Sequence, residues 1–165
     1  MNLLKFVLLT LATSMFSFTN QPLCGKVITV IDGNKIEILT DQGEKLLIKL
    51  SEVDSPELGQ EFGDEALAYT SKFCLDKIVE IDVVGKDRKG IRLGIVRLRS
   101  GKQLNTSLLQ SGLAWHSHHC IEQCEMKLLE TKAKKKKLGL WINENPTPPW
   151  IYRRQQSMRS SKSLN

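Results

Sequence analysis

Asp54 and Glu57 are the residues of this sequence whose type and spacing point most directly to chemistry. Only Ser55 and Pro56 separate them, and a turn at Pro56 presents both carboxylates on one side. Carboxylate oxygens are the ligands that a hard cation such as calcium prefers, and a glutamate can take a proton from water. The alternative interpretation is an acidic surface loop.

The N-terminus carries the pattern of an export signal. A positively charged start that ends at Lys5 precedes an apolar run over residues 6–12 and then small and polar residues. This pattern predicts a secretory signal peptide over residues 1–20 with cleavage near 17–23, and therefore an exported protein, secreted or periplasmic. A retained membrane anchor is the alternative, but the run is short for a bilayer span. We expect no stable membrane insertion after cleavage.

Four cysteines, in an oxidising compartment, suggest two disulfides with three possible connectivities. We favour the pairs Cys24–Cys74 and Cys120–Cys124. Because the second pair lies beside three histidines, a metal site there is another interpretation. Zinc sites usually combine two spaced ligand pairs, however, and the second pair is missing here.

The chain has a formal net charge of +6, and its basic residues gather toward the C-terminus. Such a balance suits a polyanionic partner, either nucleic acid or an anionic surface. The alternative is a solvated helix face followed by a disordered tail. In either case, we expect residues 154–165 to form a disordered basic tail.

The elements that must position these residues follow from the hydrophobic pattern. Turn residues separate five short β-rich segments, which span residues 25–31, 36–39, 46–50, 78–84 and 93–98. Helical spacing or helix boundary residues mark three more segments, at 64–74 with Asp64 as the N-cap, at 106–110 with Asn105 as the N-cap, and at 122–138. This order predicts an α+β, mainly β fold, a five-stranded Greek-key barrel of the OB type with three helices.

Several short motifs follow one another in order along the chain: Val30 to Asn34, Lys49 to Glu57, Phe62-Gly63, Lys86 to Gly90, Ser111 to Trp115 and Gly139 to Trp141. Together they resemble the staphylococcal nuclease (thermonuclease-like) family over residues 25–153. The resemblance implies one OB-fold domain with calcium-dependent phosphodiesterase activity on DNA and RNA and little sequence preference. We expect a monomer.

The same resemblance assigns roles to individual residues. Asp54 falls on a metal-binding acid, with the backbone carbonyl of Ser55 beside it, and Glu57 falls on the glutamate that acts on the attacking water. Asn34 stands where the family has its other metal-binding acid; its amide can ligate calcium but brings no charge, so we expect weaker binding. Lys35, in place of a threonine, adds positive charge next to the ion and is a candidate substrate contact.

Both phosphate-gripping arginine positions of the family are altered. The first is Lys49, which keeps the charge but loses the planar two-pronged grip. The second falls on Ile91, and an arginine, Arg92, stands one residue later. In a regular strand this offset turns the side chain to the opposite face, whereas a bulge after Gly90 can restore it. Both outcomes are open.

Further substrate contacts are candidates at Arg88 and His118. Where the family often has tyrosines, this chain has His116, His118 and His119, which either contact phosphate or a base or lie on a surface loop. We expect the three tryptophans to pack the core and to anchor the C-terminal segment. They are Trp115, Trp141 and Trp150.

Two main hypotheses follow. The first is an exported, metal-dependent nuclease of reduced or retuned activity on DNA or RNA. The alternative is a catalytically impaired nucleic-acid-binding module on a nuclease scaffold, and a weaker third is a structural cell-envelope protein. Convergence of Lys49 and Arg92 on the two acids would favour the enzyme.

Overall fold

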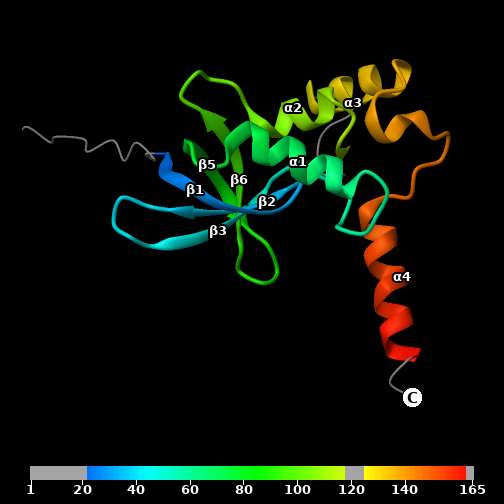
Figure 1. The fold of residues 1–165 in the computed structure, drawn as a ribbon, viewed down its shortest axis with the longest axis horizontal. Coiled ribbons are helices and arrows are strands. Elements are labelled where there is room, and N and C mark those ends of the chain that lie inside the picture. The colour runs from blue at the N-terminus through cyan, green and yellow to red at the C-terminus, as the bar shows by residue number, and fades with distance from the viewer. Residues whose placement is uncertain (1–21, 118–124, 163–165) are drawn as a thin grey trace, which may run out of the picture.

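Five strands of the computed structural model, which describes residues 22–117 and 125–162, close into a barrel (Figure 1). They are β1 (Leu23–Asp32), β2 (Lys35–Leu39), β3 (Lys45–Leu50), β5 (Ile78–Lys86) and β6 (Arg92–Leu98). The order around the barrel is β1-β2-β3-β6-β5, with β3 and β6 parallel and the other described pairings antiparallel. The five predicted strands and the predicted barrel are confirmed.

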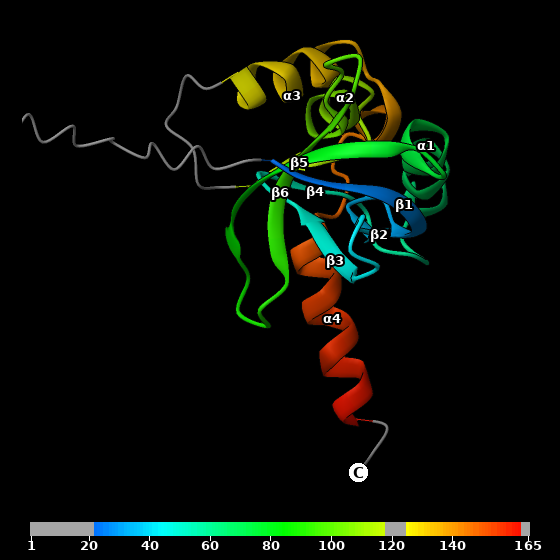
Figure 2. The same cartoon turned by 90° about the vertical axis from the view of Figure 1, so that its left-hand side faces the viewer.

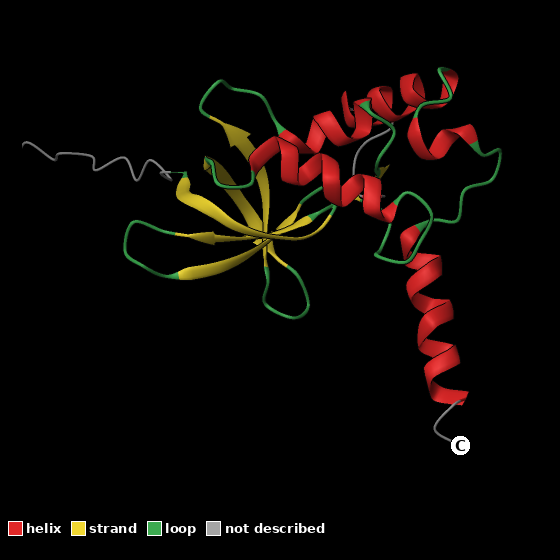
Figure 3. Cartoon of the chain, in the orientation of Figure 1, coloured by secondary structure: helices red, strands yellow, loops and turns green. Residues whose placement is uncertain are grey.

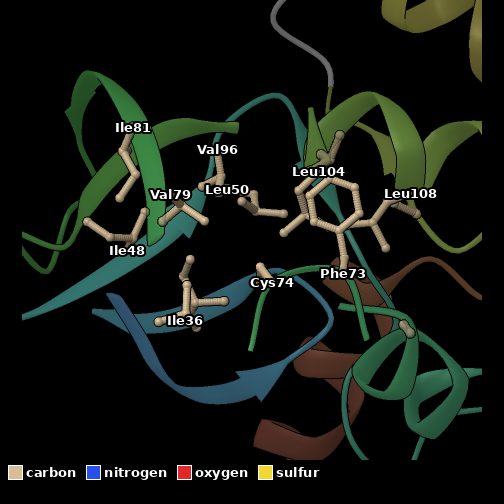
Figure 4. Close-up of a cluster of buried hydrophobic side chains, with 14 of the residues drawn as sticks. Ile36, Ile48, Leu50, Phe73, Cys74, Val79, Ile81, Val96, Leu104 and Leu108 are labelled. Carbon is tan, nitrogen blue, oxygen red and sulfur yellow. The ribbon is translucent and has the colours of Figure 1, made fainter. Parts of the chain in front are cut away.

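Alternation along these strands builds the core. Successive side chains of a strand point to opposite faces, so every second residue faces the barrel interior. Ile36 and Ile48 are fully buried there, and Phe73 and Cys74 from the first helix join the same cluster (Figure 4). The apolar side chains therefore fix the register of the strands that lead into the site.

Helices lie to one side of the barrel (Figure 3). They are α1 (Gly63–Cys74), α2 (Leu104–Gln110), α3 (Glu125–Lys135), the 3-10 helix η1 (Gly139–Ile142) and α4 (Pro149–Lys162). Two perpendicular views show α4 projecting from the rest of the molecule (Figures 1 and 2). Within residues 22–117 and 125–162, no helix is both long and apolar enough to cross a membrane.

Both predicted helix caps are wrong. Phe62, in a left-handed conformation, precedes α1, and Asp64 lies inside its first turn. Asn105 lies within α2 and is buried, where its side chain accepts from the Val96 N–H at 3.0 Å and donates to the Ser51 carbonyl at 2.8 Å. The Asn105 amide therefore does not cap the helix, because it satisfies buried backbone groups that would otherwise lack hydrogen-bond partners.

The segment at 154–165, expected to be a disordered tail, is helical as far as Lys162. Pro149 opens α4 at the position where proline favours helix initiation, and Trp150 packs against Trp115 with ring centroids 6.4 Å apart. Packing of this first turn against the rest of the protein stabilises the helix, and the composition of the segment does not reveal such packing. The predicted helix at 122–138 appears as α3; residues 122–124 and the predicted signal peptide lie outside the described residues.

The predicted Cys24–Cys74 disulfide is wrong, because both residues are free thiols. Cys24 is exposed near the start of β1, whereas Cys74 is buried at the end of α1 and donates to the Thr70 carbonyl at 3.2 Å. Burial raises the pKa of the Cys74 thiol to about 12, an effect that Lys77 only partly opposes. The predicted Cys120–Cys124 pair lies outside the described residues.

Candidate active site

A short ladder beside the barrel holds Asp54. Strand β4 (Val53–Asp54) pairs antiparallel with β7 (Trp115–His116), so that Asp54 lies opposite Trp115. The Asp54 residue is only 6% exposed. A buried carboxylate on a paired backbone has a fixed position and needs partners for its charge.

Two glycines let other elements approach the site closely. A Cβ on Gly33 would lie 2.7 Å from the Cβ atoms of Ser55 and Ala66. A Cβ on Gly63, the first residue of α1, would lie 2.2 Å from the carbonyl oxygen of Glu57. Any side chain at either glycine would therefore displace the loop between β4 and α1, which carries Glu57.

Asn34 is buried against Asp54 and donates from Nδ2 to Asp54 Oδ1 at 3.1 Å. The backbone N–H of Asn34 donates to Asp32 Oδ1 at 2.9 Å, and the Lys35 ammonium contacts Asp32 Oδ2 at 2.5 Å. The structure thus brings Asn34 to Asp54, while Lys35 forms its ion pair with Asp32.

The guanidinium of Arg153, from α4, bridges Asp54 and Glu57. Its Nη2 donates to Asp54 Oδ2 at 2.7 Å, and its Nη1 donates to Asp54 Oδ1 at 3.1 Å and to Glu57 Oε1 at 2.5 Å. The hydrogen bond with Asp54, followed by those contacts with Glu57, raises the pKa of Arg153 further above its usual value despite partial burial. These contacts therefore favour the charged form of Arg153.

The start of α4 is attached to the loop that carries Glu57. Gln60 accepts from the Glu57 N–H at 3.1 Å and donates from Nε2 to the Thr147 carbonyl at 2.5 Å. The hydroxyl of Tyr152 donates to the Gly59 carbonyl at 3.1 Å. These contacts hold the Arg153 backbone beside the acids independently of the ion pairs.

Ring contacts add a second attachment. Trp115, the strand partner of Asp54, meets Trp141 edge to face with centroids 5.5 Å apart, and it meets Trp150 at 6.4 Å. Trp150 lies three residues before Arg153, about one helical turn, so the same helix end carries both the anchor and the cation. These contacts agree with the expected anchoring of the C-terminal segment, whereas only Trp115 of the three tryptophans is buried.

Lys49 and Arg92 lie on different faces of the sheet. The parallel register of β3 and β6 sets Arg92 beside Ile48 and Lys49 beside Leu93. Because successive strand residues alternate in direction, Arg92 shares the face of the fully buried Ile48, and Lys49 takes the other face. The structure does not bring these two cations together, and their roles stay predictions.

No hydrogen bond or ion pair with Asp54 or Glu57 is found for Arg88, another predicted substrate contact, within residues 22–117 and 125–162. Arg88 is exposed in the turn between β5 and β6, where the Asp87 carboxylate accepts from the N–H groups of Lys89 and Ile91. His118 lies outside the described residues. The backbone N–H of His116, in β7, donates to Glu130 Oε1, and this contact gives no indication of a role in substrate binding.

The sequence analysis assigned Arg153 no role, because Arg153 is one of several basic residues near the C-terminus and lies at the very end of the predicted domain. The proline pair at 148–149 is a helix-start signal, and Trp150 and Arg153 are spaced one turn apart. Those two signals together could have predicted an anchored helix with a cation on one face.

The oxygens of the site fit a hard cation. Asp54 Oδ1 and Glu57 Oε1 both lie within hydrogen-bond distance of one atom, Arg153 Nη1, so two carboxylates converge on a single positive position. The buried Ser55 hydroxyl has no hydrogen-bond partner in the described part of the chain. That part also contains no group of three or more His, Cys, Asp or Glu side chains able to hold a metal. The donors suit a cation that also takes amide, carbonyl and water oxygens.

Comparisons with known proteins point to one family. Residues 47–143 match the family described as "Staphylococcal nuclease homologue". An "Uncharacterized endonuclease" of Escherichia coli O157:H7 is 30% identical over 146 residues, which cover 86% of this chain and 95% of the relative. A "Micrococcal nuclease" of Shigella flexneri is 28% identical over 140 residues, 79% of this chain and 80% of the relative. The "Staphylococcal-like nuclease CAN1" of Arabidopsis thaliana is 34% identical over 113 residues, 68% of this chain and 35% of the relative.

Proposed function

Because the chain belongs to the staphylococcal nuclease family and is a nuclease, we propose that it is an exported, calcium-dependent member acting on DNA and RNA with little sequence preference. The observation that supports this assignment most is the convergence of Asp54 and Glu57 on one cationic position. We further propose that its activity is reduced or retuned relative to that of its relatives.

Asp54, the Asn34 amide oxygen and the Ser55 carbonyl are the groups that would hold calcium. When bound, the ion supplies positive charge to the phosphate as negative charge develops on it. Asn34 turns its Nδ2 toward Asp54 in this structure, so its amide must rotate to present oxygen. Rotation of the amide exchanges the NH2 donor for the oxygen acceptor, and the two groups are nearly the same size.

Glu57 is the proposed general base. Gln60 holds its backbone, and its Oε1 faces the same point as Oδ1 of Asp54. A carboxylate so held can take the proton of a water that attacks phosphorus, an effect worth about 10²–10⁴ in rate.

The reduced rate is proposed from two substitutions. Asn34 brings no negative charge to the ion, and Lys49 offers a point charge where a guanidinium would make two parallel hydrogen bonds. Loss of one preorganised donor to a developing oxyanion typically costs about 10²–10³ in rate. Such losses do not multiply within one site, so measurable activity should remain.

Cleavage by the purified full chain tests the activity. We expect nicking of plasmid DNA and degradation of RNA that rise with calcium and stop with a chelator. Asp54→Asn should abolish calcium activation, whereas Asp41→Asn, at an exposed turn, should not. Salt-sensitive DNA binding that survives chelation, without cleavage at any calcium concentration, would instead support the binding module.

Export is tested separately. We expect residues 1–25 to direct a fused reporter enzyme out of the cytoplasm, and replacement of Leu8 and Leu9 by lysine to retain the reporter inside. Export of the lysine variant at the parental level would contradict the proposal.

A further inference from the structure

We infer that Arg153 is a phosphate-binding arginine of this nuclease, supplied by α4 in place of the guanidinium that the chain lacks at Ile91. The inference rests on the proposed function, because it assigns a new residue to that same site. It concerns a residue 96 positions from Glu57 in the chain, which only the fold brings near.

The position of the guanidinium supports this inference. Arg153 contacts both Asp54 and Glu57, so any phosphate placed between a cation on Asp54 and the base Glu57 lies within its reach. Within the described residues, these are the two ion pairs that Asp54 and Glu57 form, and both are with Arg153.

The donor geometry also suits phosphate. A guanidinium presents parallel N–H groups in a fixed plane, which match two oxygens of a carboxylate or of a phosphate equally well. Nη1 and Nη2 of Arg153 donate to the two oxygens of Asp54 in this way. The guanidinium therefore already makes the paired contact with two oxygens that a phosphate also accepts.

Accessibility distinguishes Arg153 from a buried structural ion pair. Its side chain is 42% exposed, whereas that of Asp54 is 9% exposed, so a polyanion can reach the cation from solvent. Gln60, Tyr152 and Trp150 already attach α4 through other contacts. The helix therefore does not depend on the arginine for its position.

Arg153 and calcium need the same Asp54 oxygens, so they compete for them. The inference consequently predicts opposite effects when Arg153 is removed: calcium binds more tightly, and cleavage at saturating calcium becomes slower. A residue that only blocks the site would give the first effect without the second. This difference in sign makes the role measurable.

The experiment compares Arg153→Ala and Arg153→Lys with Arg154→Ala, the change of a neighbouring exposed arginine. Kinetics of plasmid cleavage are measured at saturating calcium, and calcium affinity is measured by titration calorimetry. For a readout without turnover, each change is repeated in Glu57→Gln protein, and the affinity for a fluorescein-labelled single-stranded oligodeoxynucleotide is measured with calcium present. Thermal unfolding checks that each variant is folded.

We expect kcat of Arg153→Ala to fall about 100-fold, the scale of one lost oxyanion donor, and added guanidinium ion to restore part of it. Oligonucleotide affinity should fall about tenfold and calcium affinity should rise. Arg153→Lys keeps the positive charge, so we expect it to fold even where Arg153→Ala does not. Its kcat should still fall about tenfold, because lysine lacks the planar pair of donors. Arg154→Ala should match the parent in kcat.

Arg153 variants that cleave as fast as the active parent, or faster, at saturating calcium would overturn this inference and leave the proposed function standing. A parent chain that never cleaves DNA or RNA would overturn the proposed function and this inference with it.

Discussion

The side-chain amide of Asn34 donates to Asp54 Oδ1 at 3.1 Å, on the same oxygen that accepts from Arg153. One oxygen of Asp54 therefore accepts from both a cation and a neutral amide. The buried acid needs both partners because an uncompensated charge in that environment is costly.

Asn34→Asp is predicted to change the response to calcium. Without calcium the new carboxylate faces Asp54 and lowers the melting temperature; with calcium it adds a charged ligand and tightens binding by about tenfold. The measurement is thermal unfolding across a calcium titration. Asn145→Asp, in the exposed loop before α4, is the control. Equal calcium-induced shifts in both variants and the parent would argue against Asn34 as a ligand.

Gly63→Ala is predicted to damage both stability and activity. The added Cβ would meet the Glu57 carbonyl at 2.2 Å, and backbone overlap of this kind costs about 1–3 kcal/mol or moves the loop. Urea unfolding and plasmid cleavage should both report the change. Gly85→Ala has open space around its Cβ and should stay near the parent in both assays. A fully active, equally stable Gly63→Ala protein would contradict the proposed position of Glu57.

The Cys74 thiol is predicted to make stability fall at alkaline pH. In the folded state burial raises its pKa from 9.0 to about 12, so above pH 9 the unfolded chain loses this proton first. The contribution of the buried Cys74 thiol to the free energy of unfolding is therefore fully present below pH 9 and is lost as the pH rises toward 12. Relative to Cys74→Ala, the parent should lose about 2 kcal/mol of unfolding free energy between pH 8 and 10.5.

Cys24→Ala, at an exposed thiol, is the control for this pH series. Its difference from the parent should stay constant over the same range. A constant difference for Cys74→Ala as well would show that the thiol is not buried as described.

The sequence predicted the parts of the molecule that local pattern determines. The β-rich segments between turn residues located all five barrel strands, and the motif order located Asp54 and Glu57. It could not locate Arg153, because its contacts depend on packing between segments almost 100 residues apart. For the same reason Asn105 was assigned to a helix cap, although buried backbone groups of β6 and Ser51 determine its position.

The altered arginine positions show a second limit. Sequence offset alone left two directions open for Arg92, and the β3–β6 register placed it on the face of Ile48, away from that of Lys49. Register depends on the partner strand, which a single sequence does not display.

The central claim is that Asp54 and Glu57 are required for phosphodiester hydrolysis, and Glu57→Gln tests it most directly. The measurement is the initial rate of plasmid cleavage by the full chain at saturating calcium, beside Glu61→Gln at an exposed position of the same loop. We predict a loss of about 10²–10⁴ for Glu57→Gln, with parental melting behaviour, and no loss for Glu61→Gln. Equal rates for Glu57→Gln and the parent would contradict the claim.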